Sequence, residues 1–170
     1  MPVTPRVIRV KPLRQTDFRW RFPPDRTLHV VDIENLAGVA VPTRDRVSQV
    51  QVQYLARLRF GADDHVVLAT NHLALLNAGL GWPRARHLVR SGKDGADLEL
   101  IDVLEHENVA ARFSHVVIGS GDGGFTRAAA SLAARGIQVT VVSRWGSLSY
   151  ELSKVASDVI YLDDPLTAAA

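Results

Sequence analysis

The chain has 170 residues, of which 46% are hydrophobic and 22% are charged, and it contains no cysteine. This length suits one domain with a sizeable core, and the missing cysteines exclude disulfides, thiolate metal sites and cysteine nucleophiles. No stretch is long and apolar enough to span a bilayer, and the N-terminus lacks the continuous apolar segment of a secretory signal. We therefore expect a cytoplasmic protein that does not bind membranes.

The formal net charge of +2 is unevenly distributed along the chain. Residues 1–28 carry seven Arg or Lys against two Asp, a balance of +5, so the remainder carries −3. A basic arm on a mildly acidic body fits a polyanionic partner, and a solvated leader is the alternative interpretation. We divide the chain into a basic arm over residues 1–26, one domain over residues 27–163 and a tail over residues 164–170.

From residue 27 onward, hydrophobic patterning predicts alternating strands and helices. Short β-branched runs predict strands over residues 27–33, 65–70, 85–90, 114–120, 137–143 and 158–162. Apolar residues near helical spacing predict helices over residues 43–60, 71–81, 94–108, 123–135 and 148–155. This alternation predicts an α/β fold, a three-layer α/β/α sandwich with a mainly parallel central sheet.

Two acidic residues fall at the carboxyl ends of predicted strands, where such sheets place their ligand crevice. Asp32 ends the run LHVVD, and Asp122 follows the run HVVIGSG. A carboxylate at the end of a buried strand is costly unless it is paired, and a bound cation would offset that cost. A helix cap at Asp32 is less favoured, because residues 36–38 do not begin a convincing helix. Asn35 would orient a water or a phosphate oxygen, or be an ordinary turn residue.

Two further acids, Asp97 and Asp102, lie on the predicted helix over residues 94–108. Their spacing places them about 140° apart around the helix, so both cannot point straight at one cation. We expect one to bind the cation directly and the other to act from the flank or through water. Alternatively, Asp97 lies at the third helical position after an Asp94 N-cap, where an acid interacts favourably with the helix dipole.

Other candidates flank these acids. Lys93 would contact a phosphate or remain a solvated loop lysine, and Ser120 would hydrogen-bond within the site or stabilise a turn. The segment GSGDGG also matches G-x-G-x-x-G through Gly119, Gly121 and Gly124. A dinucleotide fingerprint normally opens the first strand–helix unit, whereas this motif is late in the chain and Asp122 would repel a pyrophosphate. Nucleotide or cofactor binding is therefore only a third interpretation.

The order and spacing of these motifs resemble those of NYN domains, a branch of the PIN-like nuclease superfamily. The resemblance covers residues 28–162. VVDIEN is similar to the family's opening strand with its Asp and Asn, KDGADLELIDVL resembles its Lys-Gly-x-Asp helix, and VVIGSGDGGF resembles its Ser-Gly-Asp-x-Asp-Phe segment.

This resemblance implies a PIN-like fold and metal-dependent hydrolysis of RNA, with Mg²⁺ or Mn²⁺ as the cofactor. The metal ligands would be Asp32, Asp97 and Asp122. Asp102 would assist in deprotonating the attacking water. The RNA-binding residues would be Asn35, Lys93 and Ser120.

The chain departs from the family pattern at Gly124, where a second acid is often found. Glycine has no side chain that ligates a cation. The leading interpretation is a metal-dependent endoribonuclease. The alternative is a catalytically weak RNA-binding or regulatory module of the same fold. The number of metal ions and the formation of a homodimer are left open.

Overall fold

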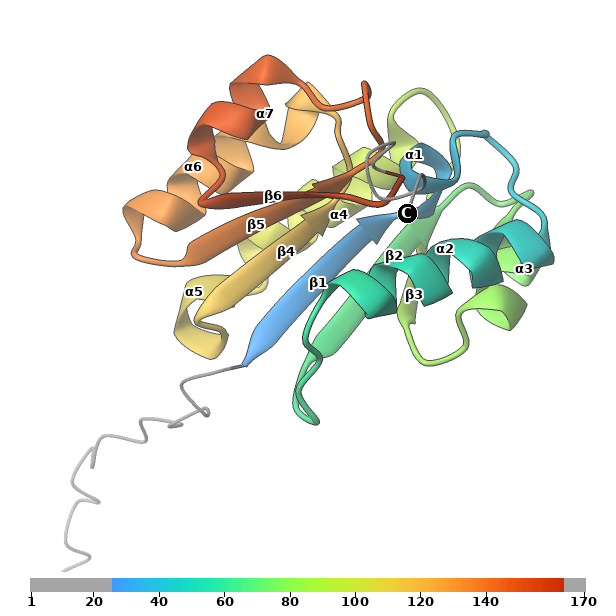
Figure 1. Cartoon of the computed structure of the whole chain (residues 1–170), viewed down its shortest axis with the longest axis horizontal. Coiled ribbons are helices and arrows are strands. Elements are labelled where there is room, and N and C mark those ends of the chain that lie inside the picture. The colour runs from blue at the N-terminus through green and yellow to red at the C-terminus, as the bar shows by residue number, and fades with distance from the viewer. Residues whose placement is uncertain (1–25, 164–170) are drawn as a thin grey trace, which may run out of the picture.

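The computed structural model describes residues 26–163 (Figure 1). The expected tail, and the expected arm apart from Arg26, lie outside this range. Within it, six parallel strands form one sheet with the order β3-β2-β1-β4-β5-β6. The strands are β1 (Thr27–Asp32), β2 (His65–Thr70), β3 (Arg86–Val89), β4 (His115–Gly119), β5 (Gln138–Ser143) and β6 (Asp158–Tyr161). The predicted parallel α/β fold is confirmed.

The helices divide between the two faces of this sheet (Figure 1). One face is covered by α1 (Ile33–Ala37), α2 (Arg44–Arg57) and α3 (Leu75–Gly81). The other face is covered by α4 (Gly95–His106), α5 (Val109–Arg112), α6 (Thr126–Ala134) and α7 (Tyr150–Val155). The short 3₁₀ helix η1 (Gly123–Phe125) leads into α6. Among the helices of residues 26–163, none has the length and apolar character needed to cross a membrane.

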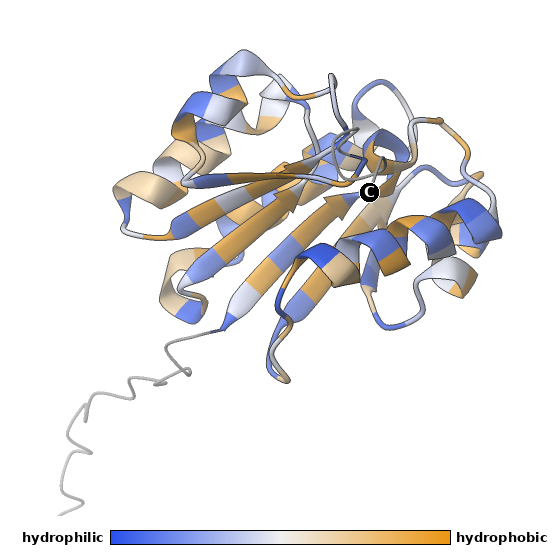
Figure 2. Cartoon of the chain, in the orientation of Figure 1, coloured by the Kyte–Doolittle hydropathy of each residue, from blue (hydrophilic) through white to orange (hydrophobic). Residues whose placement is uncertain are grey.

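Alternation along the strands gives the protein two cores, one on each face of the sheet. Figure 2 shows the hydrophobic colouring concentrated in the strands, as expected for a parallel sheet covered on both sides. In β1, Val30 packs in the core beneath α4–α7, and Val31 packs in the core beneath α1–α3. The same alternation places the next residue, Asp32, on the α4 side of the sheet.

The strand order creates a crevice at the carboxyl end of the sheet. The chain builds β1, β2 and β3 outward in one direction and then returns to place β4 on the other side of β1. Helix α1 after β1 and helix α6 after β4 cover opposite faces, so the chain diverges at this point and leaves a crevice. Asp32 ends β1 and Ser120 follows β4, so both predicted site residues lie at this crevice.

The structure corrects one sequence-based prediction at the start of this crevice. Asp32 does cap a helix: its Oδ1 accepts hydrogen bonds from the backbone N–H groups of Glu34 and Asn35 at 3.0 and 3.1 Å. Helix α1 has only five residues and is ended by Gly38, whose φ of 76° suits glycine. Residues 36–38 look unconvincing as a helix start because they are its end.

Helix boundaries elsewhere differ more modestly from the prediction. The helix expected over residues 123–135 begins as η1, because Asp122 Oδ1 accepts a hydrogen bond from Gly124 N at 2.7 Å and draws the backbone into a tighter turn. The one-turn helix α5 is not predicted from the sequence, since four residues are too few to show helical spacing.

Candidate metal site at the carboxyl end of the sheet

The side chains of Asp32 and Asp97 meet in the crevice. Asp32 is 5% exposed at the end of β1. Asp97, the third residue of α4, approaches it from the helix that covers the same face, and both side chains line the same hollow. Two carboxylates this close cannot both ionise without a large cost. Within the described residues, the buried Oδ1 of Asp97 has no hydrogen-bond partner.

The pKa of each carboxyl in this pair is raised, mainly by burial. The pKa of Asp97 rises to about 8 through burial, then through the charge and hydrogen bond of Asp32, with a smaller effect from Asp122. Burial also raises the pKa of Asp32, although the backbone N–H of Asn35 and the side chain of Asp97 favour its ionised form. Asp97 is therefore the member of the pair whose pKa lies high enough to favour its protonated form near neutral pH.

Ser120 connects this pair to Asp122. The Ser120 hydroxyl is fully buried, donates to Asp32 Oδ2 at 3.4 Å and accepts from Asp122 N at 3.2 Å. The Asp122 side chain is exposed and caps η1. It affects Asp97 through its charge. The structure thus places Asp122 beside the pair, at the rim of the crevice.

Asn35 fixes the loop that carries Asp122. Its Oδ1 accepts from Gly121 N at 3.1 Å, and its backbone oxygen accepts from Arg144 Nε at 2.7 Å. A Cβ atom on Gly121 would lie 2.2 Å from the backbone oxygen of Ser147. Close packing therefore explains this glycine of the G-x-G-x-x-G match without any bound dinucleotide.

Two predicted site residues are not brought to the acidic pair. The Asp102 side chain is 69% exposed, and its Oδ1 lies 2.9 Å from His106 Nδ1. It is not among the charges that act on Asp97, so the structure does not support a role for Asp102 at the attacking water. Lys93 is exposed in the loop before α4. Asp97 and Asp102 lie on different sides of α4, as their spacing predicts, and Asp97 is the acid that faces the crevice.

Glu34 is a site residue that the sequence analysis did not single out. Its Oε1 accepts hydrogen bonds from Thr70 Oγ1 at 3.2 Å and from Asn71 Nδ2 at 2.9 Å, which ties α1 to the end of β2. With Asp32, Asp97 and Arg90, it lines a hollow of about 170 Å³. Glu34 is visible in the sequence as the second acid in VVDIEN, but its partner Asn71 is distant in sequence, so no local pattern joins the two residues.

These residues fit a divalent cation in part. Within residues 26–163, no three His, Asp or Glu side chains are arranged to form a complete cation site. Mg²⁺, however, is often bound through only one or two carboxylates while it keeps several waters. Such a cation would displace the proton that the raised pKa of Asp97 favours, and it would satisfy the unpartnered Oδ1 of Asp97. The donor set suits Mg²⁺ or Mn²⁺, since both prefer oxygen ligands.

Comparison with known proteins supports the resemblance read from the sequence. A family model described as the NYN domain matches residues 42–163. The match includes Asp97 and Asp122 and begins ten residues after Asp32. The fold is similar to the crystal structure of a protein of unknown function from Vibrio parahaemolyticus RIMD 2210633, with a TM-score of 0.55 and 17% identity over 83% of this chain and 94% of that chain. That likeness concerns the fold alone. No curated protein matches the chain.

Proposed function

Because the chain belongs to the NYN domain family of PIN-like nucleases, we propose that it is a metal-dependent endoribonuclease that hydrolyses phosphodiester bonds of RNA. The observation that carries the proposal is that Asp32 and Asp97, both with raised pKa values, line one hollow at the switch point of the sheet. Near neutral pH, two buried carboxyl groups with raised pKa values cost the fold stability, and a bound cation would offset that cost.

The residues of the crevice have distinct roles in this proposal. Asp32 and Asp97 hold the metal ion, and Asp122 contributes from the rim directly or through water. A bound Mg²⁺ or Mn²⁺ lowers the pKa of its water and stabilises charge on the phosphate oxygens. Ser120 keeps Asp32 oriented through its 3.4 Å hydrogen bond. Arg90, on the wall of the hollow, and Lys93, in the loop beside it, supply positive charge for the RNA backbone.

The direct test is cleavage of a labelled single-stranded RNA in the presence of Mn²⁺ or Mg²⁺. We expect the wild-type protein to produce fragments that disappear when the metal is chelated. Asp32→Asn retains an oxygen that can cap α1, so this variant should stay folded and lose cleavage. Full activity of Asp32→Asn, confirmed as metal-dependent, would contradict the proposal.

A catalytically weak RNA-binding module is the second candidate, and two observations favour it. Only two carboxyl groups are in contact, and the residues described contain no complete cation site. A Cβ atom on Gly124 would lie 3.1 Å from Asp122 Oδ1, so a side chain there would stand next to that carboxylate. Asp122 is therefore the only acid that this segment brings to Asp32 and Asp97, because Gly124 has no side chain to add a second one.

Gly124→Asp separates the two candidates. If the protein is a weak module, wild type binds RNA without cutting it even in millimolar Mn²⁺, and the variant gains cleavage. If the protein is an active ribonuclease, wild type already cuts. An active wild-type protein would rule out the second candidate.

A further inference from the structure

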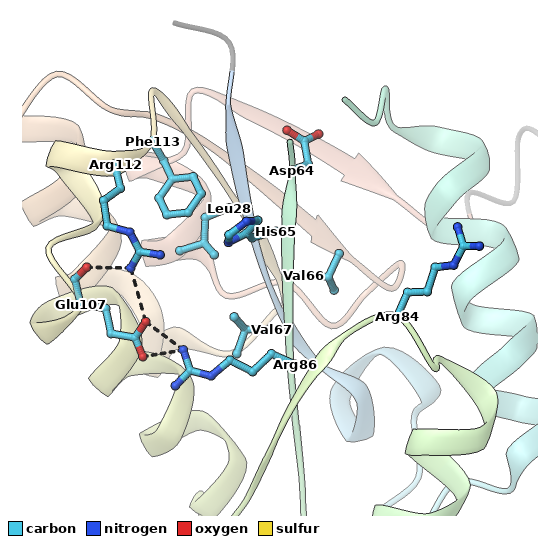
Figure 3. Close-up of a pocket in the computed structure, with 10 residues that line it drawn as sticks. All are labelled: Leu28, Asp64, His65, Val66, Val67, Arg84, Arg86, Glu107, Arg112 and Phe113. Carbon is cyan, nitrogen blue, oxygen red and sulfur yellow. Dashed lines mark hydrogen bonds and ion pairs between the residues drawn. The ribbon is translucent and has the colours of Figure 1, made fainter. Parts of the chain in front are cut away.

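A second pocket, here called the amino-end pocket, lies at the opposite end of the sheet from the acidic crevice (Figure 3). It has a volume of about 230 Å³, and its lining includes His65, Arg84, Arg86, Glu107, Arg112 and Phe113. His65 begins β2 and Thr70 ends it, so roughly 17 Å of strand separates the two sites at about 3.3 Å per residue. This pocket takes no part in the proposed chemistry.

Glu107 holds two arginine side chains at this pocket, as Figure 3 shows. Arg86 Nη1 lies 2.7 Å from Glu107 Oε1, and Arg112 Nη1 lies 3.6 Å from Oε2 and donates to the Glu107 backbone oxygen at 3.1 Å. Each guanidinium uses only Nη1 in this way. In the described part of the chain, Nε and Nη2 of both arginines have no hydrogen-bond partner. Most of their donors therefore remain available to an anion.

Phe113 fixes the position of the positive charge. The guanidinium carbons of Arg112 and Arg26 lie 5.1 and 4.9 Å from the centre of its ring. The ring itself is 4% exposed, so it supports the two arginines rather than a ligand. A cation held on an aromatic face is pre-organised and loses little further freedom when an anion binds.

The pocket retains an excess of positive charge. Its lining has three arginines against two acids, and they are Arg84, Arg86 and Arg112 against Asp64 and Glu107. Asp64 is largely occupied in the fold, since its two oxygens accept hydrogen bonds from Thr27 N and Gly61 N. The ligand class that this balance selects is an anion with several acceptor oxygens, and a phosphate meets that description.

Edge strand β3 connects the amino-end pocket to the acidic crevice. Leu88 packs in the core beneath α4, so Arg86 and Arg90, two residues before and after it, share that side of the strand. Arg86 lines the amino-end pocket and Arg90 lines the acidic hollow. Four residues of strand place them roughly 13 Å apart. The two arginines therefore lie along one side of the sheet edge, where Arg90 also pairs with Glu99 at 3.6 Å.

The basic N-terminal sequence joins the fold at the same end. Residues 1–25 include six Arg or Lys, and they lead directly into Arg26, which contacts His65 and Phe113. Those residues also include two Asp, so their balance is +4, a net charge that attracts a polyanion.

We propose that the amino-end pocket binds a backbone phosphate of single-stranded RNA through Arg86 and Arg112, so that the strand runs along β3 from the acidic crevice to the opposite end of the sheet. The inference rests on the proposed ribonuclease function for its choice of RNA as the polyanion. It predicts that the protein distinguishes RNAs by length, because only a strand that spans both ends reaches the second phosphate site.

The test measures binding in EDTA, so that cleavage plays no part. Fluorescence anisotropy compares a 4-nucleotide and a 16-nucleotide oligouridylate on wild type, Arg86→Gln, Arg86→Gln/Arg112→Gln and the charge-matched control Arg135→Gln, an exposed arginine at the end of α6. We expect the double variant to bind the 16-mer about tenfold more weakly and to lose about 0.7 from its log–log salt slope, as the loss of one neutralised phosphate requires. The exposed Arg86→Gln alone should weaken binding about threefold.

The controls decide between the outcomes. Affinity for the 4-mer, and all affinities of Arg135→Gln, should stay within about twofold of wild type, as expected for charges that touch no phosphate. Equal affinity of the double variant and Arg135→Gln for the 16-mer would overturn the inference, and so would thermal stabilisation of wild type by AMP with no change in RNA binding. If the double variant binds the 16-mer more weakly than wild type, and wild type itself does not cleave RNA, that result would uphold this inference and refute the ribonuclease proposal.

Discussion

The two ends of the sheet carry opposite chemistry. At the carboxyl end, Asp32 and Asp97 line one hollow, and among residues 26–163 no basic side chain forms an ion pair with either. At the amino end, Glu107 lies between Arg86 and Arg112, and each charge there is paired while positive charge remains in excess. We accordingly propose a cation at the carboxyl end and an anion at the amino end.

This difference follows from how a parallel sheet is built. All strands point the same way, so Asp32 at the end of β1 and Asp97 in the first turn of α4 lie at one edge and are held there by the packing of both cores. At the other edge, Arg86 on β3 and Arg112 on α5 both pair with Glu107. Acids are consequently placed together at the carboxyl end, whereas the two arginines at the amino end share an acidic partner.

The largest expected effect is on cleavage, and it comes from Asp97. Asp97→Asn should lower RNA cleavage by at least about 100-fold, because the metal's charge stabilisation is worth several kcal/mol. Asp102→Asn, on the same helix but exposed and paired with His106, is the matched control and should retain nearly full activity. Equal losses in both variants would show that the two acids act together and would contradict the geometry.

The next effect concerns stability at low pH. Burial lowers the pKa of His29 from 6.5 to about 4, so the folded state disfavours its charged form. Its contribution to stability is present above pH 6.5 and is lost as the pH falls toward 4, by on the order of 3 kcal/mol. His29→Gln cannot titrate and should flatten the urea-unfolding free energy over this range. An unchanged pH slope in His29→Gln would assign acid sensitivity to other groups.

A smaller loss is expected at the loop that carries Asp122. Gly121→Ala places a methyl group 2.2 Å from Ser147 O and 2.4 Å from Ser143 Oγ, and such overpacking costs about 1–3 kcal/mol. Gly79→Ala in α3 meets no atom within 4 Å and should instead add about 0.5–1 kcal/mol. Chemical denaturation of both variants measures the contrast. A neutral Gly121→Ala would show that the loop relaxes easily.

The acidic end should also respond to high pH, in the direction opposite to His29. The pKa of Asp97 is raised from 3.8 to about 8, so its contribution to stability is full below pH 3.8 and is lost as the pH rises to 8. Asp97→Asn should therefore be more stable than wild type at pH 8 by roughly 1–2 kcal/mol, after solvent screening of a half-buried group, and the gain should vanish near pH 4. Thermal melts at both pH values check this, and a variant less stable than wild type at pH 8 would contradict it.

The sequence predicts the sheet well because its strands are buried on both faces and their apolar runs are unmistakable. It also places Asp32 and Asp122 at strand ends, which is sufficient to locate the crevice. It misses α1, since a five-residue helix after a strand has no periodicity to detect. It cannot choose between Asp97 and Asp102, because helical geometry gives their angular offset but not which of them faces β1.

The amino-end pocket cannot be predicted from the sequence, for a different reason. Its arginines come from the start of β1, from β3 and from α5, and no local motif joins them. Glu107 becomes informative only once α4 is packed against the sheet and brings it between Arg86 and Arg112. Such sites depend on tertiary contacts between segments far apart in the chain.

Calorimetric titration with Mn²⁺ tests the central claim most directly, because it asks whether Asp32 and Asp97 hold a cation without requiring an RNA. We expect wild type to bind Mn²⁺ at pH 8 with at least tenfold higher affinity than either Asp32→Asn or Asp97→Asn, to release a proton on binding, and to bind more weakly at pH 6, where Asp97 stays protonated. Equal Mn²⁺ affinity in wild type and both variants would show that this pair of acids is not a metal site.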